Sequence, residues 1–373
     1  MTGTTRPTPC PASATSPKVE RVSAANPFRD VALHVVSGRG GTGKSTVAAA
    51  LALALAADGR RVLLCEVEGR QGISRMFDVD PLPYAETRIA TGLPDPDGRA
   101  GTVHALHIDK ESALLEYLAM YYRLGRAGRA LEKFGALEFA TTVAPGVGDV
   151  LLTGKVYEAV RRNSRNKQAV TYDAVVLDAP PTGRIAQFLN VNGELAGLAK
   201  VGPIRAQADK VMTLFRSADT RIHLVTLLEE MPVQETLDAI TELESAELPV
   251  GAVIANRVGG SELDPHELEQ AATGALDRDR IAAELAEVGL SDPGTVTALL
   301  DLGREHAERI ALQDEQRALV SGTPHPYVEL PLLSVSDRPD AGAGVDLGGL
   351  YELAADLVAQ GLTGHRPEDE GRR

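Results

Sequence analysis

Residues 38–46 read Gly38-Arg39-Gly40-Gly41-Thr42-Gly43-Lys44-Ser45-Thr46, between an apolar run at residues 31–36 and an alanine- and leucine-rich helical pattern at residues 47–57. This order predicts a strand, a glycine loop and a helix, which is the context of a P-loop. Glycines let backbone N–H groups fold round phosphate oxygens, and the helix start adds the positive end of its dipole. All residues of the loop are therefore candidate nucleotide-binding residues.

Two residues of the loop decide between two kinds of nucleotide site. The loop glycines also spell G-x-G-x-x-G, and Glu66 follows at the distance expected of a ribose-binding acid in a dinucleotide fold. Lys44 and Ser45, directly after the last glycine, favour a nucleoside triphosphate instead. Lys44 would neutralise the β- and γ-phosphates, and the Ser45 hydroxyl would ligate Mg²⁺. ATP and Mg²⁺ are the expected cofactors, with the dinucleotide site and a purely structural turn as alternatives.

Composition restricts the class of protein. The formal net charge of −14 argues against a surface that holds nucleic acid or anionic lipid non-specifically, so stable nucleic-acid binding is not expected. Cys10 and Cys65 are the two cysteines, without a C-x-x-C pattern, so neither a disulfide framework nor a cysteine zinc site is expected. These features favour a cytoplasmic location, and peripheral association with a membrane stays open.

The chain divides into three predicted parts. Residues 1–28 are rich in Thr, Pro, Ser and Ala and lack a continuous apolar run, which predicts a disordered leader rather than a signal peptide. Residues 29–362 are expected to form one α/β P-loop domain with a doubly wound, mostly parallel sheet. Helical insertions are expected at about residues 110–165 and 262–320, and a flexible charged tail at residues 363–373.

A second predicted strand, residues 61–66, ends in a polar, glycine-flexible loop. Doubly wound sheets place their ligand chemistry after such strands. Glu68 in this loop is therefore a candidate catalytic residue that orients the attacking water, and an exposed loop carboxylate is the alternative interpretation. Asp149 and Glu66 are the next candidates for the same role.

A third buried strand is predicted at residues 172–178 and ends in Asp178. A carboxylate at the end of a strand beside a P-loop suits the Walker-B role, in which it holds Mg²⁺ directly or through a water. Gly183 follows closely and could bring its backbone N–H to the γ-phosphate, because it has no side chain in the way. An Asp that only caps a turn is the structural alternative. Further strands are predicted at residues 221–227, 249–256 and 327–330.

These motifs together resemble the ArsA-type anion-transporting ATPases and their relatives that target tail-anchored membrane proteins, within the deviant-Walker-A class. The similarity covers roughly residues 31–362 and is carried by the loop at residues 38–46 and by residues 178–184, similar to the family's D-T-A-P-T-G-H. The E-V-E-G-R-Q-G sequence after the second strand resembles the actinobacterial branch. The resemblance implies that Asn256 reads the adenine and that Pro331 and Leu332 belong to the loop enclosing it.

The resemblance also implies a mechanism. Family members form nucleotide-bridged dimers that open and close with the ATP cycle, so we expect a homodimer, or a heterodimer with a related ATPase, that acts on a protein client or a membrane partner. A partition-type ATPase acting on DNA or membrane, and an ATP-binding switch with weak hydrolysis, are the alternatives.

Three positions depart from the family pattern. Arg39 replaces the family's signature lysine, Glu68 replaces its switch I aspartate, and Arg184 replaces its switch II histidine. Arg39 keeps the charge and, by the resemblance, would reach across the dimer to the partner's phosphates as a catalytic residue. The cysteines that bind zinc or arsenite in the family have no counterpart here, so a soft-ligand site is not expected.

Overall fold

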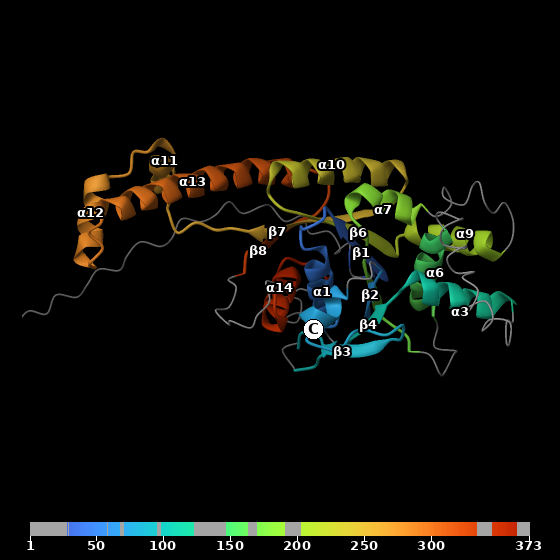
Figure 1. Ribbon diagram of the computed structural model, residues 1–373. Helices are drawn as coiled ribbons and strands as arrows, with labels where there is room; N and C mark the ends of the chain where they lie inside the picture. The colour runs from blue at the N-terminus through green and yellow to red at the C-terminus, as the bar shows by residue number, and fades with distance from the viewer. Residues whose placement is uncertain are drawn as a thin grey trace, which may run out of the picture.

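The structure is a computed structural model that describes residues 28, 30–57, 59–67, 71–94, 98–122, 147–162, 170–190, 203–333 and 345–363. One eight-stranded sheet runs through this part of the chain, in the order β3-β4-β2-β5-β1-β6-β7-β8, with helices against both faces (Figure 1). Every neighbouring pair is parallel except β3 and β4. The strands are β1 (Leu33–Gly38), β2 (Arg61–Glu66), β3 (Thr87–Thr91), β4 (Thr102–His107), β5 (Ala174–Asp178), β6 (Thr220–Thr226), β7 (Val250–Val258) and β8 (Tyr327–Pro331).

The central strands show why the sheet is parallel and covered. Strands β1 and β5 are buried at every position, and β2 at every position but its first. Continuous apolar runs of this kind are typical of parallel strands with helices on both faces. The prediction of a doubly wound, mostly parallel α/β sheet is therefore confirmed.

One face of the sheet is covered by α1 (Lys44–Leu55), α2 (Gly72–Met76) and α14 (Leu347–Ala359). Helix α1 is apolar nearly all round, as expected of a helix buried between two layers. It lies between the sheet and α14, whose buried side chains pack toward it. The apolar side of α14 is therefore occupied within the chain.

The opposite face carries a second apolar core against the same sheet. Near β4 and β5 it includes helices from the predicted 110–165 insertion, of which residues 123–146 and 163–165 lie outside the described part. The helices on this face are α3 (Lys110–Tyr122), α6 (Val147–Arg161), α7 (Thr182–Leu189), α9 (Pro203–Phe215) and α10 (Glu230–Ser245).

The second predicted insertion forms an arm of three helices, and α13 extends well beyond the sheet with α11 and α12 at its far end (Figure 1). The sequence pattern suggested one helical stretch, but Gly274 and Gly289 adopt positive φ angles that break it. Aspartates cap the start of each segment. The arm consists of α11 (Pro265–Thr273), α12 (Arg278–Glu287) and α13 (Pro293–Ser321).

Several predicted element boundaries require correction. The first strand extends to Gly38 because its pairing with β6 continues to Val225. Helix α1 begins at Lys44 rather than at residue 47, directly after the left-handed Gly43. Phe28, assigned from composition to the leader, is buried in the core. No helix in the described part of the chain has the length and hydrophobicity to span a bilayer.

Candidate functional site

The glycine loop joins β1 to α1, and its first glycine is set by close packing. Gly38 lies beside Val225 of β6, where a Cβ atom on residue 38 would come within 2.1 Å of the Val225 carbonyl oxygen. Gly41 and Gly43 adopt φ angles of 91° and 89°, a region that favours glycine. The loop conformation therefore depends on glycine at these three positions.

Two side chains brace the loop from behind. The buried Thr42 hydroxyl donates to the Arg39 carbonyl at 2.9 Å. Asn256, at the carboxyl end of β7 and 4% exposed, donates its amide N–H to the Thr42 carbonyl at 2.8 Å. A Cβ atom on Gly43 would lie 2.3 Å from that amide nitrogen, so Asn256 packs directly on the loop.

This bracing is a role of Asn256 that sequence reasoning missed. A polar residue at the carboxyl end of a buried strand is the signal that could have pointed to it, because parallel strands end at the same edge of the sheet. The adenine-reading role implied by the resemblance stays a prediction. Pro331 ends β8, and Leu332, 61% exposed, follows it. Leu332 donates its backbone N–H to the Val258 carbonyl at the end of the neighbouring strand β7.

The two predicted Mg²⁺ ligands meet in the structure. The Ser45 hydroxyl, in the first turn of α1, donates to Asp178 Oδ2 at 2.6 Å. Hydroxyl and carboxylate oxygens are the ligands that Mg²⁺ prefers. The Ser37 hydroxyl donates to the Pro180 carbonyl at 2.6 Å, which ties the end of β1 to the segment after β5 and fixes the approach of Asp178.

Lys44 supplies positive charge at the start of α1. The side chain is buried, and the first turn of α1 contains no acidic residue. Among the described residues no carboxylate forms an ion pair with Lys44. The positive end of the α1 dipole lies at the same place and disfavours a cation there. The Lys44 ammonium and the helix dipole together create a positive potential that a bound anion would offset.

These residues fit a nucleoside triphosphate with Mg²⁺. Gly40 and Gly41 form the exposed outer turn of the loop, and nothing lies within 4 Å of the position that a Cβ atom would take on either residue. Backbone N–H groups there are accessible, the ammonium of Lys44 stands at the helix start, and the Ser45–Asp178 pair offers oxygen ligands. The donor set is that of a phosphate and magnesium site.

Arg39 points away from its own loop. Its side chain is 38% exposed, and Nε lies 3.4 Å from Glu235 Oε1 on α10. Gly183 and Arg184, in the first turn of α7, are also exposed. The neighbouring Thr182 hydroxyl is buried and has no hydrogen-bond partner among the described residues.

The predicted water-orienting residue, Glu68, lies outside the described residues. Glu66, the nearby alternative, is buried and pairs in register with Asp178 across β2 and β5. Its Oε1 accepts the Gly72 backbone N–H at 2.7 Å, and its Oε2 lies 3.3 Å from His107 Nδ1. These contacts direct its carboxylate inward, away from the exposed position that a ribose contact requires, and tie the last residue of β2 to the first residue of α2.

Asp149, the remaining carboxylate considered, lies in the first turn of α6 and is largely buried. Its Oδ1 is 3.8 Å from the ammonium of Lys110 on α3. The described residues contain no cluster of three or more His, Cys, Asp or Glu side chains that could hold a metal ion.

Comparison with known proteins agrees with this site. A family model described as "Anion-transporting ATPase" matches residues 32–218. The chain is 54% identical over 333 residues to ATPase BagA of Mycobacterium tuberculosis, and this match covers 89% of this chain and 94% of that protein. It is 24% identical over 263 residues to ATPase GET3 of Kluyveromyces lactis, covering 61% and 72%. It is also 24% identical over 252 residues to an Aquifex aeolicus protein named as an arsenical pump-driving ATPase, covering 59% and 78%.

Proposed function

We propose, from the premise that this chain belongs to the anion-transporting ATPase family, that it is an Mg²⁺-dependent ATPase whose dimer opens and closes with the ATP cycle and so acts on a protein client. The family establishes the ATPase activity. The dependence on Mg²⁺, the dimer and the client are the proposal. The observation that supports the Mg²⁺-dependent ATPase site is the contact between the Ser45 hydroxyl and Asp178 at the start of α1.

The residues of the site divide the work of ATP hydrolysis. Bound ATP and Mg²⁺ supply a polarised γ-phosphate. Lys44 binds the phosphate charge, while Ser45 and Asp178 hold the metal. The backbone N–H of the exposed Gly183 would donate to phosphate, and Glu68 would orient the attacking water. The roles of Lys44, Ser45 and Asp178 follow from the chemistry of their side chains and from their positions at the carboxyl edge of the sheet.

Arg39 supports the dimer part of the proposal. Its guanidinium lies beside α10 rather than over its own loop, so it is accessible to a second chain. A planar group with five donors suits bidentate contact with phosphate supplied in trans. Both a homodimer and a heterodimer with a related ATPase satisfy this geometry.

One observation bears on the partition-type alternative. A partition-type ATPase that binds membrane through a C-terminal amphipathic helix is disfavoured, because the apolar side of α14 packs toward α1. A nucleotide switch with weak hydrolysis differs from the proposal only in its rate, so measured turnover separates the two.

The proposal is tested by titrating ATP–Mg²⁺ into the Lys44→Ala variant by calorimetry. Charge-assisted hydrogen bonds contribute about 1.5–3 kcal/mol, so ATP affinity should fall by about 10- to 150-fold. Lys110→Ala, which removes a half-exposed lysine of α3, is the matched control and should bind normally. Unchanged ATP affinity in Lys44→Ala would overturn the assignment of the site. In Asp178→Asn, we expect chelation of Mg²⁺ to change ATP affinity less than it does in the unaltered chain.

A further inference from the structure

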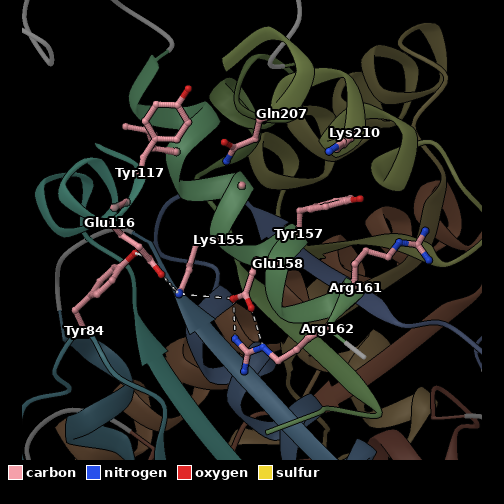
Figure 2. Close-up of a pocket in the computed structure, with 13 residues that line it drawn as sticks. Tyr84, Glu116, Tyr117, Lys155, Tyr157, Glu158, Arg161, Arg162, Gln207 and Lys210 are labelled. Carbon is pink, nitrogen blue, oxygen red and sulfur yellow. Dashed lines mark hydrogen bonds and ion pairs between the residues drawn. The ribbon is translucent and has the colours of Figure 1, made fainter. Parts of the chain in front are cut away.

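A cavity lies away from the glycine loop, between α3, α6 and α9 and beside Tyr84 (Figure 2). Its volume is about 440 Å³, and no residue of the loop at residues 38–46 lines it. Small-molecule sites in proteins typically enclose about 300–1,000 Å³. The cavity is therefore large enough for a ligand of its own.

Most of the wall is apolar or aromatic. Tyr117 and Leu151 are buried in the core, and the rings of Tyr84 and Tyr157 complete the wall. Aromatic side chains of this kind prefer flat, apolar partners, against which rings can stack or meet edge to face. The cavity thus suits a ligand with an aromatic body.

The charges at one side of the cavity are already compensated within the chain. Lys155 Nζ lies 2.7 Å from Glu116 Oε1 and 3.6 Å from Glu158 Oε2, and Arg162 pairs with Glu158 at 2.7 Å. Hydrogen bonds to Glu158 and Glu86 raise the pKa of Arg162, which stays charged. A ligand charge placed here would have to compete with these pairs.

The other side of the cavity, above Tyr157 in Figure 2, carries Gln207 and Lys210 of α9. They are three residues apart on one helix face. Among the described residues no carboxylate pairs with Lys210, although the nearby Arg205 of α9 pairs with Asp209. Gln207 lies close against α6, because a Cβ atom on Gly154 would come within 1.6 Å of its amide nitrogen. An amide and an ammonium without a carboxylate partner form a combination that binds an anionic group.

We propose that this cavity binds a small organic monoanion with an aromatic body, whose negative group contacts Lys210 and the amide of Gln207. The site is separate from the nucleotide site, and the proposal does not depend on the ATPase cycle. Arg161, a further cation of the lining, pairs with Asp219 at 3.0 Å. The proposal follows from an aromatic wall on one side and from lining cations that are already in ion pairs. The exposed Lys210 and the Gln207 amide then lie where the ligand charge would be.

Calorimetric titration with naphthalene-1-sulfonate tests the proposal, with the neutral 1-naphthalenemethanol as the matched ligand. We expect the anion to bind saturably to one site per chain and the alcohol to bind more weakly. Lys210→Met should weaken binding of the anion about tenfold and leave binding of the alcohol unchanged. Arg205→Met, which removes a cation of the same helix outside the cavity, should bind both ligands normally.

A second variant tests the location of the site independently. Ala113 is a buried lining residue, so Ala113→Leu narrows the cavity and should abolish binding of both ligands. If that variant does not fold, the comparison of Lys210→Met with Arg205→Met remains decisive. The proposal is overturned if naphthalene-1-sulfonate does not bind saturably at millimolar concentrations. It is also overturned if Lys210→Met binds the anion as the unaltered chain does.

Discussion

Replacing Glu235 by Gln should strengthen ATP-dependent dimerisation. In the single chain, Glu235 of α10 holds Arg39 through an ion pair whose two side chains are 37% and 38% exposed. If Arg39 reaches the partner's phosphates, this pair must break when the dimer forms. The substitution removes the pair in advance and leaves the shape of the side chain unchanged.

The magnitude follows from the exposure of the pair. Ion pairs this accessible to solvent contribute about 0.2–1 kcal/mol. A closed dimer of two identical chains breaks two of them, so Glu235→Gln should stabilise the dimer by about 0.4–2 kcal/mol. The dimer Kd should therefore fall by about 2- to 30-fold, and the difference should shrink at high ionic strength because exposed charges are screened.

Sedimentation velocity over a range of protein concentrations, with Mg²⁺ and a non-hydrolysable ATP analogue, measures this Kd. Glu242→Gln is the control, since it removes the same charge from an exposed position on the same helix. A Glu235→Gln dimer that is no tighter than the Glu242→Gln dimer would refute the exchange of Arg39 between Glu235 and the partner's phosphates.

Three further predictions follow from the site and the core. Gly43→Ala should weaken ATP binding because its Cβ would clash with the Asn256 amide, and adding Asn256→Ala should recover part of the loss. Additive losses in a double-mutant cycle of ATP affinities would refute the clash. Glu68→Gln should keep ATP bound but slow turnover by on the order of 10²-fold or more, because a water-activating carboxylate acts in the transition state. Single-turnover hydrolysis at the unaltered rate would assign this role elsewhere. His34 and His223 are buried, and burial lowers the pKa of both, that of His223 to about 3. Below about pH 6.5 the unfolded chain binds protons on these histidines that the folded chain does not. The free energy of unfolding should therefore fall by about 1.4 kcal/mol for each histidine and for each unit by which the pH is lowered, between about pH 6.5 and 5. If the free energy of unfolding measured by urea denaturation does not depend on pH in this range, the two histidines are not held neutral in the folded chain.

The parts predicted correctly from the sequence are those encoded by neighbouring residues. The loop at residues 38–46 is contiguous in sequence, and Asp178 ends a continuous apolar run, so the position of each in the fold can be predicted locally. Buried parallel strands such as β2 and β5 likewise give uninterrupted patterns. Strand β3 was missed because it lies at the sheet edge and is mostly exposed, and its sequence has no apolar run.

Other features depend on contacts between distant parts of the chain. Asn256 braces the loop across a separation of 214 residues, and Arg39 meets Glu235 on a helix from a later unit of the fold. No local pattern carries that information. Glu66 was considered only as a possible base or ribose contact, because its bond to the Gly72 backbone appears only once the chain is folded.

The role of Arg39 in a nucleotide-bridged dimer is tested most directly by mixing two inactive chains. Arg39→Ala should bind ATP nearly normally yet lose ATP-induced dimerisation and most hydrolysis, and Lys44→Ala should lose tight ATP binding. In a mixed dimer, the Arg39→Ala site keeps its own Lys44 and receives an intact Arg39 from its partner. Hydrolysis should therefore recover in the mixture. If Arg39→Ala alone dimerises with ATP and hydrolyses it at the unaltered rate, the proposed action of Arg39 across the dimer is contradicted.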